Sequence, residues 1–392
     1  MSGYKKVIYI AIAVIILLGA LWVLIQKLQL NKNFPDPLSA LPENAIIFYK
    51  GSHFRTDFNQ IAQTDFWNSL NSHQEIRSMV KTYSLLDSAI SKYPKLNDYL
   101  NSQEIILSLH KISRSKTGIL LLLQTMEKFK EDEILEILNT EMGIIAREHH
   151  FEGCNIFNYQ VKNQQSKLAF TLLDGILAIS SSSIIVEDAV RAYHSFTGII
   201  DKTNFGISFA AYKENWFINF RQLPFFLDLF ASEDYIDPAK SLSYFAQTAN
   251  YELDFENESF SLRGSTQTTD TFNGFNSLFL NQTPRKTDIS KIASLKSALL
   301  CSYHLSDFKT YLQHYQDYLK YSQRWSPYEA EKLNFIKEHQ INIENDILPL
   351  LKGQFAISLH EPFSEDIKKS KIIYVKVEDV AEATHILREY DS

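Results

Sequence analysis

A run of nineteen apolar residues near the amino terminus constrains this chain more than any other feature. Val7–Ile25 reads VIYIAIAVIILLGALWVLI and contains neither a charged residue nor a proline. As an α-helix it would be about 28 Å long, close to the ~30 Å hydrocarbon core of a bilayer. We therefore predict a single transmembrane anchor over 7–25. Its representative anchor residues are Val7, Ile16, Leu17, Trp22 and Ile25.

A cleaved signal peptide is the alternative interpretation of the same run. Lys5 and Lys6 fit its charged start, but the apolar core of a signal peptide is usually shorter, about 7–15 residues. The segment Gln26–Leu30 offers no small-residue cleavage site. No cysteine precedes Cys154, so lipoprotein processing is excluded. We favour an uncleaved signal anchor.

Flanking charges give little information on orientation. Lys5 and Lys6 lie on one side of the run, and Lys27 and Lys32 lie on the other. A short amino-terminal tail before an apolar run acts as a start-transfer signal, so we predict a cytoplasmic tail. The body would then be extracytoplasmic, periplasmic if there is an outer membrane, and held at the inner (cytoplasmic) membrane. The alternative is a cytoplasmic body on a helix of opposite orientation.

The rest of the chain is acidic. The sequence has 39 Lys+Arg and 46 Asp+Glu, a formal net charge of −7, and its first 32 residues include four lysines and no acid. A nucleic-acid-binding body would be expected to present a basic face, so we predict no nucleic-acid partner. The 27 Phe and 20 Tyr fit either a cavity for apolar ligands or A/T-rich coding, and we favour the second.

Residue patterning after the anchor predicts an α+β body of antiparallel sheets with helices on one side. Pro35 and Pro37 end any continuing helix, which indicates a stalk. The expected organisation is a tail (1–6), the anchor (7–25), a stalk (26–40), a first α+β repeat (41–200), a middle segment with a hairpin (201–288) and a second, partial repeat (289–392).

An internal duplication is the most informative pattern in the body. Ile106–His110 (ILSLH) matches Ala356–His360 (AISLH) at an offset of 250 residues. Thr56–Phe58 matches Ser306–Phe308 at the same offset. The order strand, helices, strand, strand, helix is predicted around both copies.

The second copy is the shorter one. The first copy is predicted to continue with four strands and a helix over 144–196, whereas the second reaches Ser392 after its last helix. We expect a truncated form of a longer two-repeat protein, with an unpaired sheet edge in its second half. The alternative is that the middle segment completes the second sheet.

Four loose motifs lie in this framework. They are Leu-Pro-x-x-Ala at 41–45, Ser-Leu-His at 108–110, Leu-Leu-Asp-Gly-x-Leu-x-Ile-Ser at 172–180 and Asn-Phe-Arg-Gln-Leu-Pro at 219–224. With the single anchor, they resemble a family of uncharacterised bacterial membrane-anchored proteins classed as a domain of unknown function. The resemblance covers most of 41–390. It implies a location in the cell envelope and brings no catalytic residues.

The densest group of metal-ligand types is EHHFEGC at 148–154. On a strand, Glu148, His150 and Glu152 would share one face and could bind a divalent metal. The alternative is a solvated strand face. Because the sequence places no second ligand group, we favour that alternative and predict neither a metal nor a cofactor.

Other chemical signatures are equally sparse. Ser108 and His110 would share one face of their strand, and we interpret His110 as a polar edge residue. An S-x-x-K and a K-T-G string overlap at Lys116, which we interpret as a coincidence. GxGxxG, Walker A, GxSxG and HExxH motifs do not occur, so no enzymatic activity is predicted, although dispersed catalytic residues would escape this search.

These observations favour a non-enzymatic function. We predict a membrane-anchored extracytoplasmic interaction or structural module of the cell envelope. Its partners would be the bilayer, through the anchor, and an envelope protein or polymer. The alternative is a carrier or sensor of lipid or another apolar ligand, and an undetected hydrolase is least favoured.

Overall fold

The computed structural model describes residues 35–52, 54–92, 94, 97–98, 101, 103–113, 116–125, 131–142, 145–160, 167–195, 215–229, 236–256, 259–268, 273–348, 351–360 and 370–390. The chain divides into two compact units, Met1–Thr203 and Asn204–Ser392. The predicted tail, anchor and most of the stalk lie outside the described residues. Among the helices of the described ranges, none is both long and apolar enough to cross a membrane.

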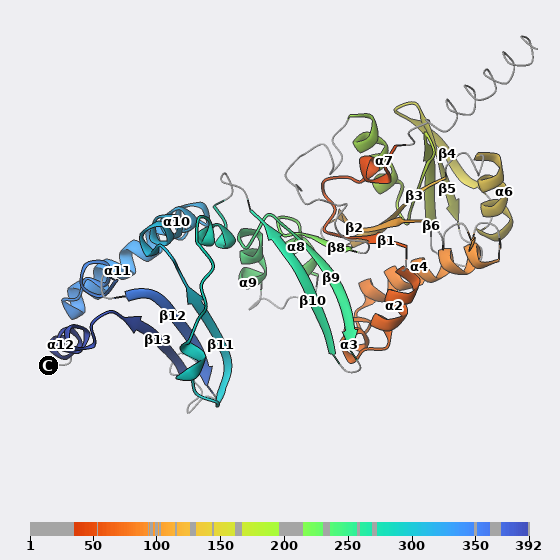
Figure 1. The fold of residues 1–392 in the computed structure, drawn as a ribbon. Coiled ribbons are helices and arrows are strands. Elements are labelled where there is room, and N and C mark those ends of the chain that lie inside the picture. Colours follow the sequence, from red (N-terminus) through yellow and green to blue (C-terminus); the bar gives the residue numbers. More distant parts are fainter. Residues whose placement is uncertain are drawn as a thin grey trace, which may run out of the picture. The chain divides into compact units, whose positions relative to one another are not determined.

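The first unit is built on antiparallel strands. Its elements are η1 (Pro37–Ala40), β1 (Ile47–Gly51), α2 (Phe54–Ala62), α3 (Asp65–Leu70), α4 (Gln74–Ser91), β2 (Ile105–Ser113), β3 (Lys116–Gln124), α6 (Glu131–Met142), β4 (Ile145–Phe151), β5 (Cys154–Gln160), β6 (Lys167–Leu173), β7 (Ile176–Ser180) and α7 (Ser183–His194). Its strands are ordered β1-β2-β3-β7-β6-β5-β4, and all neighbours are antiparallel (Figure 1). The chain therefore returns through β7 to the edge of β3.

Two-residue turns close the hairpins β6–β7 and β4–β5. Asp174 and Gly175 have φ angles of 43° and 92°, so the predicted type I′ turn is confirmed. Glu152 and Gly153 form the second turn, with φ angles of 45° and 87°. Glu152 therefore lies in a turn and not on a face of strand β4.

Helices cover both faces of the first sheet, and the prediction of helices on one side is wrong. Helix α7 packs so closely on β3 that a Cβ atom on Gly118 would lie 2.7 Å from the Ile185 side chain. On the opposite face, Leu135 of α6 packs against the core cluster that includes Leu121 and Leu123 of β3. The central strands are apolar on both faces, so each face requires a cover.

The second unit contains two groups of strands. Its elements are β8 (Asn215–Asn219), α8 (Leu223–Leu227), α9 (Ile236–Ser241), η5 (Leu242–Tyr244), β9 (Thr248–Glu256), β10 (Ser259–Gln267), η6 (Phe275–Phe279), η7 (Ile289–Lys291), β11 (Ser297–His304), α10 (Phe308–Tyr321), α11 (Trp325–His339), η8 (Ile343–Ile347), β12 (Leu351–His360), β13 (Lys371–Val377) and α12 (Val380–Tyr390). Strands β8, β9 and β10 pair in that order, and the middle hairpin is confirmed. Strands β11, β12 and β13 form a separate three-stranded sheet. The middle segment therefore does not complete the second sheet.

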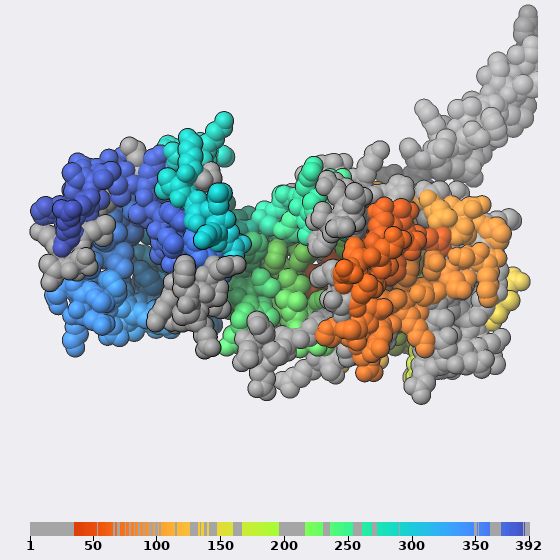
Figure 2. Space-filling view, turned by 90° about the horizontal axis from the view of Figure 1, so that it is seen from below, coloured from red at the N-terminus to blue at the C-terminus, as the bar shows by residue number. Residues whose placement is uncertain are grey.

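The same order of elements recurs in the two units. Strand β1, helices α2 to α4, β2, β3 and α6 have counterparts in β11, helices α10 and α11, β12, β13 and α12. Helices α2 to α4 contribute to the orange surface in Figure 2, and α10 to α12 are blue. Ser108 of β2 lies opposite Leu120 of β3, and Ser358 of β12 lies opposite Ile372 of β13. The two Ser-Leu-His motifs thus have the same place and register in their sheets.

The second sequence match fails in the structure. Asp307 is the N-cap of α10, and its side chain accepts a hydrogen bond from the Thr310 backbone N–H at 3.0 Å. Asp57 lies inside α2 and accepts a hydrogen bond from the Tyr49 hydroxyl at 3.1 Å. The prediction that Thr56–Phe58 and Ser306–Phe308 are equivalent is therefore wrong.

Gly353 of β12 offers a test of close packing in the second unit. Its φ is +72°, and an added Cβ atom would lie 2.5 Å from the Leu305 carbonyl oxygen. We expect Gly353→Ala to lower the free energy of unfolding by about 2 kcal/mol or more, since left-handed backbone alone costs ~1–2 kcal/mol. Gly153→Ala is the control, because its φ is +87° but the nearest atom is 4.0 Å away. Equal losses in urea unfolding would contradict a role for the Leu305 contact.

Candidate functional site

The predicted membrane anchor is not tested by the described residues. Val7, Ile16, Leu17, Trp22 and Ile25 all lie outside them. The anchor therefore stays a prediction from the sequence.

The three metal candidates do not share one strand face. Strand β4 ends at Phe151, and Glu152 begins the turn that follows it. His150 Nδ1 lies 3.0 Å from Asn155 Oδ1, and Glu152 Oε1 lies 4.0 Å from Arg191 Nε. Glu148 is exposed on β4. Across the ranges that the structure describes, no group of three or more His, Cys, Asp or Glu side chains is placed to hold a metal ion.

His149, between two of those candidates, lines a cleft on the other face of β4. Its Nε2 lies 3.0 Å from Glu187 Oε1 on α7, and its Nδ1 lies 3.3 Å from Asn158 Nδ2. The cleft has a volume of about 500 Å³ and is also lined by Lys116, Arg147, Lys167 and Ser181–Ser183. Tyr159, Leu168 and Ala169 add apolar surface to the lining, and this mixture with charged and hydroxyl groups suits a small polar ligand better than a lipid. The cleft therefore gives the predicted carrier function no support.

His110 is a core residue, and its interpretation as a polar edge histidine is wrong. Its side chain is only 1% exposed. Nδ1 lies 2.9 Å from Asn44 Oδ1, and Nε2 lies 2.8 Å from Ser108 Oγ. An amide oxygen accepts, so Nδ1–H donates to Asn44 and Nε2 accepts from the serine hydroxyl. Burial lowers the pKa of His110 to about 3, and the imidazole is neutral.

The second unit contains the same pair. His360 Nε2 lies 2.9 Å from Ser358 Oγ, and both side chains are buried. Ser297 Oγ is 3.5 Å from the same ring nitrogen. Burial keeps both pairs from a bulk substrate. We therefore interpret them as structural hydrogen bonds that satisfy polar groups inside the sheets.

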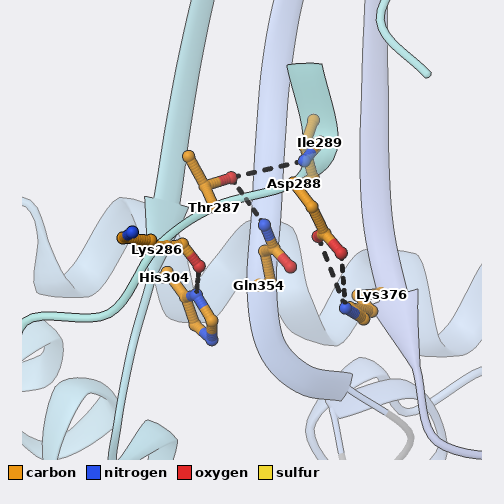
Figure 3. A network of polar contacts seen from close by, with 7 residues as sticks. All are labelled: Lys286, Thr287, Asp288, Ile289, His304, Gln354 and Lys376. Atoms are coloured by element: carbon orange, nitrogen blue, oxygen red, sulfur yellow. Dashed lines mark hydrogen bonds and ion pairs between the residues drawn. The ribbon is translucent and has the colours of Figure 1, made fainter. Parts of the chain in front are cut away.

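A short segment before β11 lies against β12 and β13 near Gln354 and Lys376 (Figure 3). Gln354 of β12 donates a hydrogen bond to the Thr287 hydroxyl, and Lys376 Nζ of β13 lies 3.0 Å from Asp288 Oδ2. Ile289 of the same segment is buried. In the second unit η7 contacts β12, and in the first unit η1 contacts β3 and β7.

The opposite face of the second sheet carries exposed apolar side chains. Ile357 of β12 lies opposite Ile373 of β13, so both point to one face. Leu299 and Val375 share this face by register and alternation. All four are exposed, and Ile373 is 67% exposed. We call Leu299, Ile357, Ile373 and Val375 the apolar sheet surface.

Strand β13 also has a free edge within the described chain. It pairs with β12, and the sheet order β11-β12-β13 leaves it at the end. Ile372, which points to the Ser358 face, is exposed as well. Among the described residues, β13 is therefore an edge strand of its sheet.

Comparisons with known proteins assign no family. The chain matches no protein-family model, and searches of the curated proteins and of the solved structures give no significant match. The resemblance to uncharacterised membrane-anchored proteins stays a prediction. The functional argument therefore depends on the site geometry.

Proposed function

We propose that this chain is a membrane-anchored interaction module whose body lies outside the cytoplasmic membrane and binds an envelope polypeptide. The binding site is the sheet β11-β12-β13. The observation that carries the proposal is the apolar sheet surface together with the adjacent free edge of β13. Clustered exposed apolar side chains mark protein interaction sites, because burying them on binding is favourable.

We take the two units as related repeats, and this supports the proposal. By register, Ile373 and Val375 of β13 correspond to Leu121 and Leu123 of β3. Leu121 is 8% exposed, against 67% for Ile373. The same position is thus core in one copy and surface in the other. Ile373 and Val375 are apolar, as the core residues of the first unit are, but they are exposed. Such side chains are suited to binding a partner.

The proposed location of the body outside the cytoplasmic membrane rests on the sequence of Val7–Ile25. A protease-protection experiment tests this location. In spheroplasts, added protease is expected to degrade the body, because the body is outside. A body that is cut only after the membrane is permeabilised would contradict the orientation. Extraction of the chain by carbonate without detergent would contradict the anchor itself.

Partner binding is tested by proximity labelling of the full-length chain in cells. We expect a specific set of labelled envelope proteins that is lost when Ile373→Lys places a charge on the apolar sheet surface. Leu333→Lys is the matched control, since Leu333 on α11 is 64% exposed and does not belong to that surface. Identical labelling by the two variants would contradict the proposed function.

A further inference from the structure

The polar cleft of the first unit lies where helix α7 begins, on the face of the sheet that this helix covers. Gly118 of β3 faces Ile185 of α7, and Lys116 lies two residues before Gly118 on the same face of the strand. Arg147 of β4 lies two residues before His149, whose ring contacts α7 through Glu187. Strand alternation thus brings cations from two strands to the start of one helix.

Positive charge is concentrated in this cleft, although the chain as a whole has a net charge of −7. The described residues that line it include the cations Lys116, Arg147 and Lys167 and the carboxylate of Glu187. That carboxylate already contacts the His149 ring at 3.0 Å. In the part of the chain that the structure describes, none of the three cations has an ion-pair partner. An anion that enters the cleft therefore meets uncompensated positive charge.

The start of α7 also attracts negative charge. The helix spans Ser183–His194 and has no acidic residue in its first turn. Its N-cap residue, Ser182, lines the cleft, and the Ser182 side chain makes no capping hydrogen bond. The first backbone N–H groups of a helix have no partner within the helix, and the helix dipole favours an anion beside them. Phosphate groups bind to proteins in this way.

We propose that this cleft binds a small soluble molecule that carries a phosphate group. The phosphate would lie between the first turn of α7 and the three cations. The cleft volume of about 500 Å³ leaves room for more than the phosphate and is typical of small-molecule sites. The apolar part of the lining, which includes Ala169, suits the uncharged part of the ligand. This site belongs to the first unit and does not depend on the proposed binding of a polypeptide by the sheet β11-β12-β13.

Inorganic pyrophosphate is the probe, because it is small and presents phosphate oxygens with several negative charges. The full-length chain in detergent is titrated by calorimetry at constant salt, and we expect saturable binding to a single site. Bound pyrophosphate should slow amide hydrogen exchange at Ile184 and Ile185, in the first turn of α7, because their N–H groups then donate to the ligand. No binding, or binding without slower exchange at these two amides, would overturn the proposal.

Charge variants of the lining have opposite expected effects on the affinity. Arg147→Gln and Lys167→Gln should each weaken pyrophosphate binding about fivefold, the effect of losing one exposed ion pair. Glu187→Gln should strengthen binding, because it removes a negative charge and keeps an acceptor for His149. Arg77→Gln is the matched control, since Arg77 of α4 is exposed and lies outside the lining. Equal weakening by Arg77→Gln and Arg147→Gln would show that binding follows net charge and not this site.

Urea unfolding verifies that the variants are folded. The midpoints of Arg147→Gln and Lys167→Gln should match that of the wild type, because both side chains are exposed. If one midpoint falls, Lys116→Gln takes the place of that variant, since Lys116 is also an exposed cation of the lining. Unchanged pyrophosphate affinity in the folded variants would overturn the proposal.

A lipid headgroup is the other source of a phosphate group, and short-chain phosphatidic acid tests it under the same conditions. We expect pyrophosphate to bind at least about tenfold more tightly, because charged and hydroxyl groups dominate the lining. Tighter binding of the phosphatidic acid would overturn the assignment to a small soluble molecule.

Discussion

Lowering the pH from 7 to 4 is expected to remove about 3 kcal/mol of stability from the first unit through His110 alone. This histidine is neutral and buried, with a folded pKa of about 3, and its pKa rises to about 6.5 when the chain unfolds. Between these values the unfolded state binds more protons than the folded state. The contribution is therefore fully present above pH 6.5 and is lost as the pH falls toward 3.

The measurement is urea unfolding as a function of pH for the wild type and for His110→Gln. The variant cannot be protonated, so its stability should depend less on pH between 6.5 and 3, even if its stability at pH 7 is lower. His150→Gln is the control, because it removes an exposed histidine of the same unit and leaves the buried His110 in place. Equal pH dependence for His110→Gln and the wild type would show that His110 is not held neutral.

The sequence predicted which face of β2 carries His110 but not that this face is buried. Strand alternation placed Ser108 and His110 together, and this is correct. The cover comes from Asn44, in the segment before β1, and from α7, which follows β7. Contacts between segments so distant in sequence leave no periodic pattern in the sequence. From the sequence alone, a polar pair such as Ser108 and His110 is therefore placed at the surface.

The placement of Glu148, His150 and Glu152 on one strand face had a different difficulty. Asp174-Gly175 was recognised as a turn because aspartate and glycine are the favoured pair at positive φ. Glu152-Gly153 adopts the same kind of turn, but glutamate is not a favoured turn residue, so this turn was not recognised. The exposure of the apolar side chains on β13 could not be predicted from the sequence, because it depends on which neighbouring elements cover them.

Lysine substitutions at equivalent positions of the two units should have very different effects. Leu123 of β3 and Val375 of β13 correspond by register, but Leu123 is 1% exposed and Val375 is 45% exposed. Leu123 lies in the core with Phe170 and Leu177, so Leu123→Lys leaves a charge without a partner among apolar side chains. We expect a loss of about 4 kcal/mol or more, enough to unfold the first unit. Val375→Lys should cost less than about 1 kcal/mol.

Unfolding of the full-length variants, followed by hydrogen exchange in each unit, measures both losses in one experiment. If Val375→Lys costs as much as Leu123→Lys, then β13 is already covered within the protein, and it has no free edge for a partner. If it costs little, the second sheet has retained the chemistry of a core strand at a position where folding does not require it. An exposed apolar edge that folding does not require is a liability for aggregation, so its presence supports the proposed binding function.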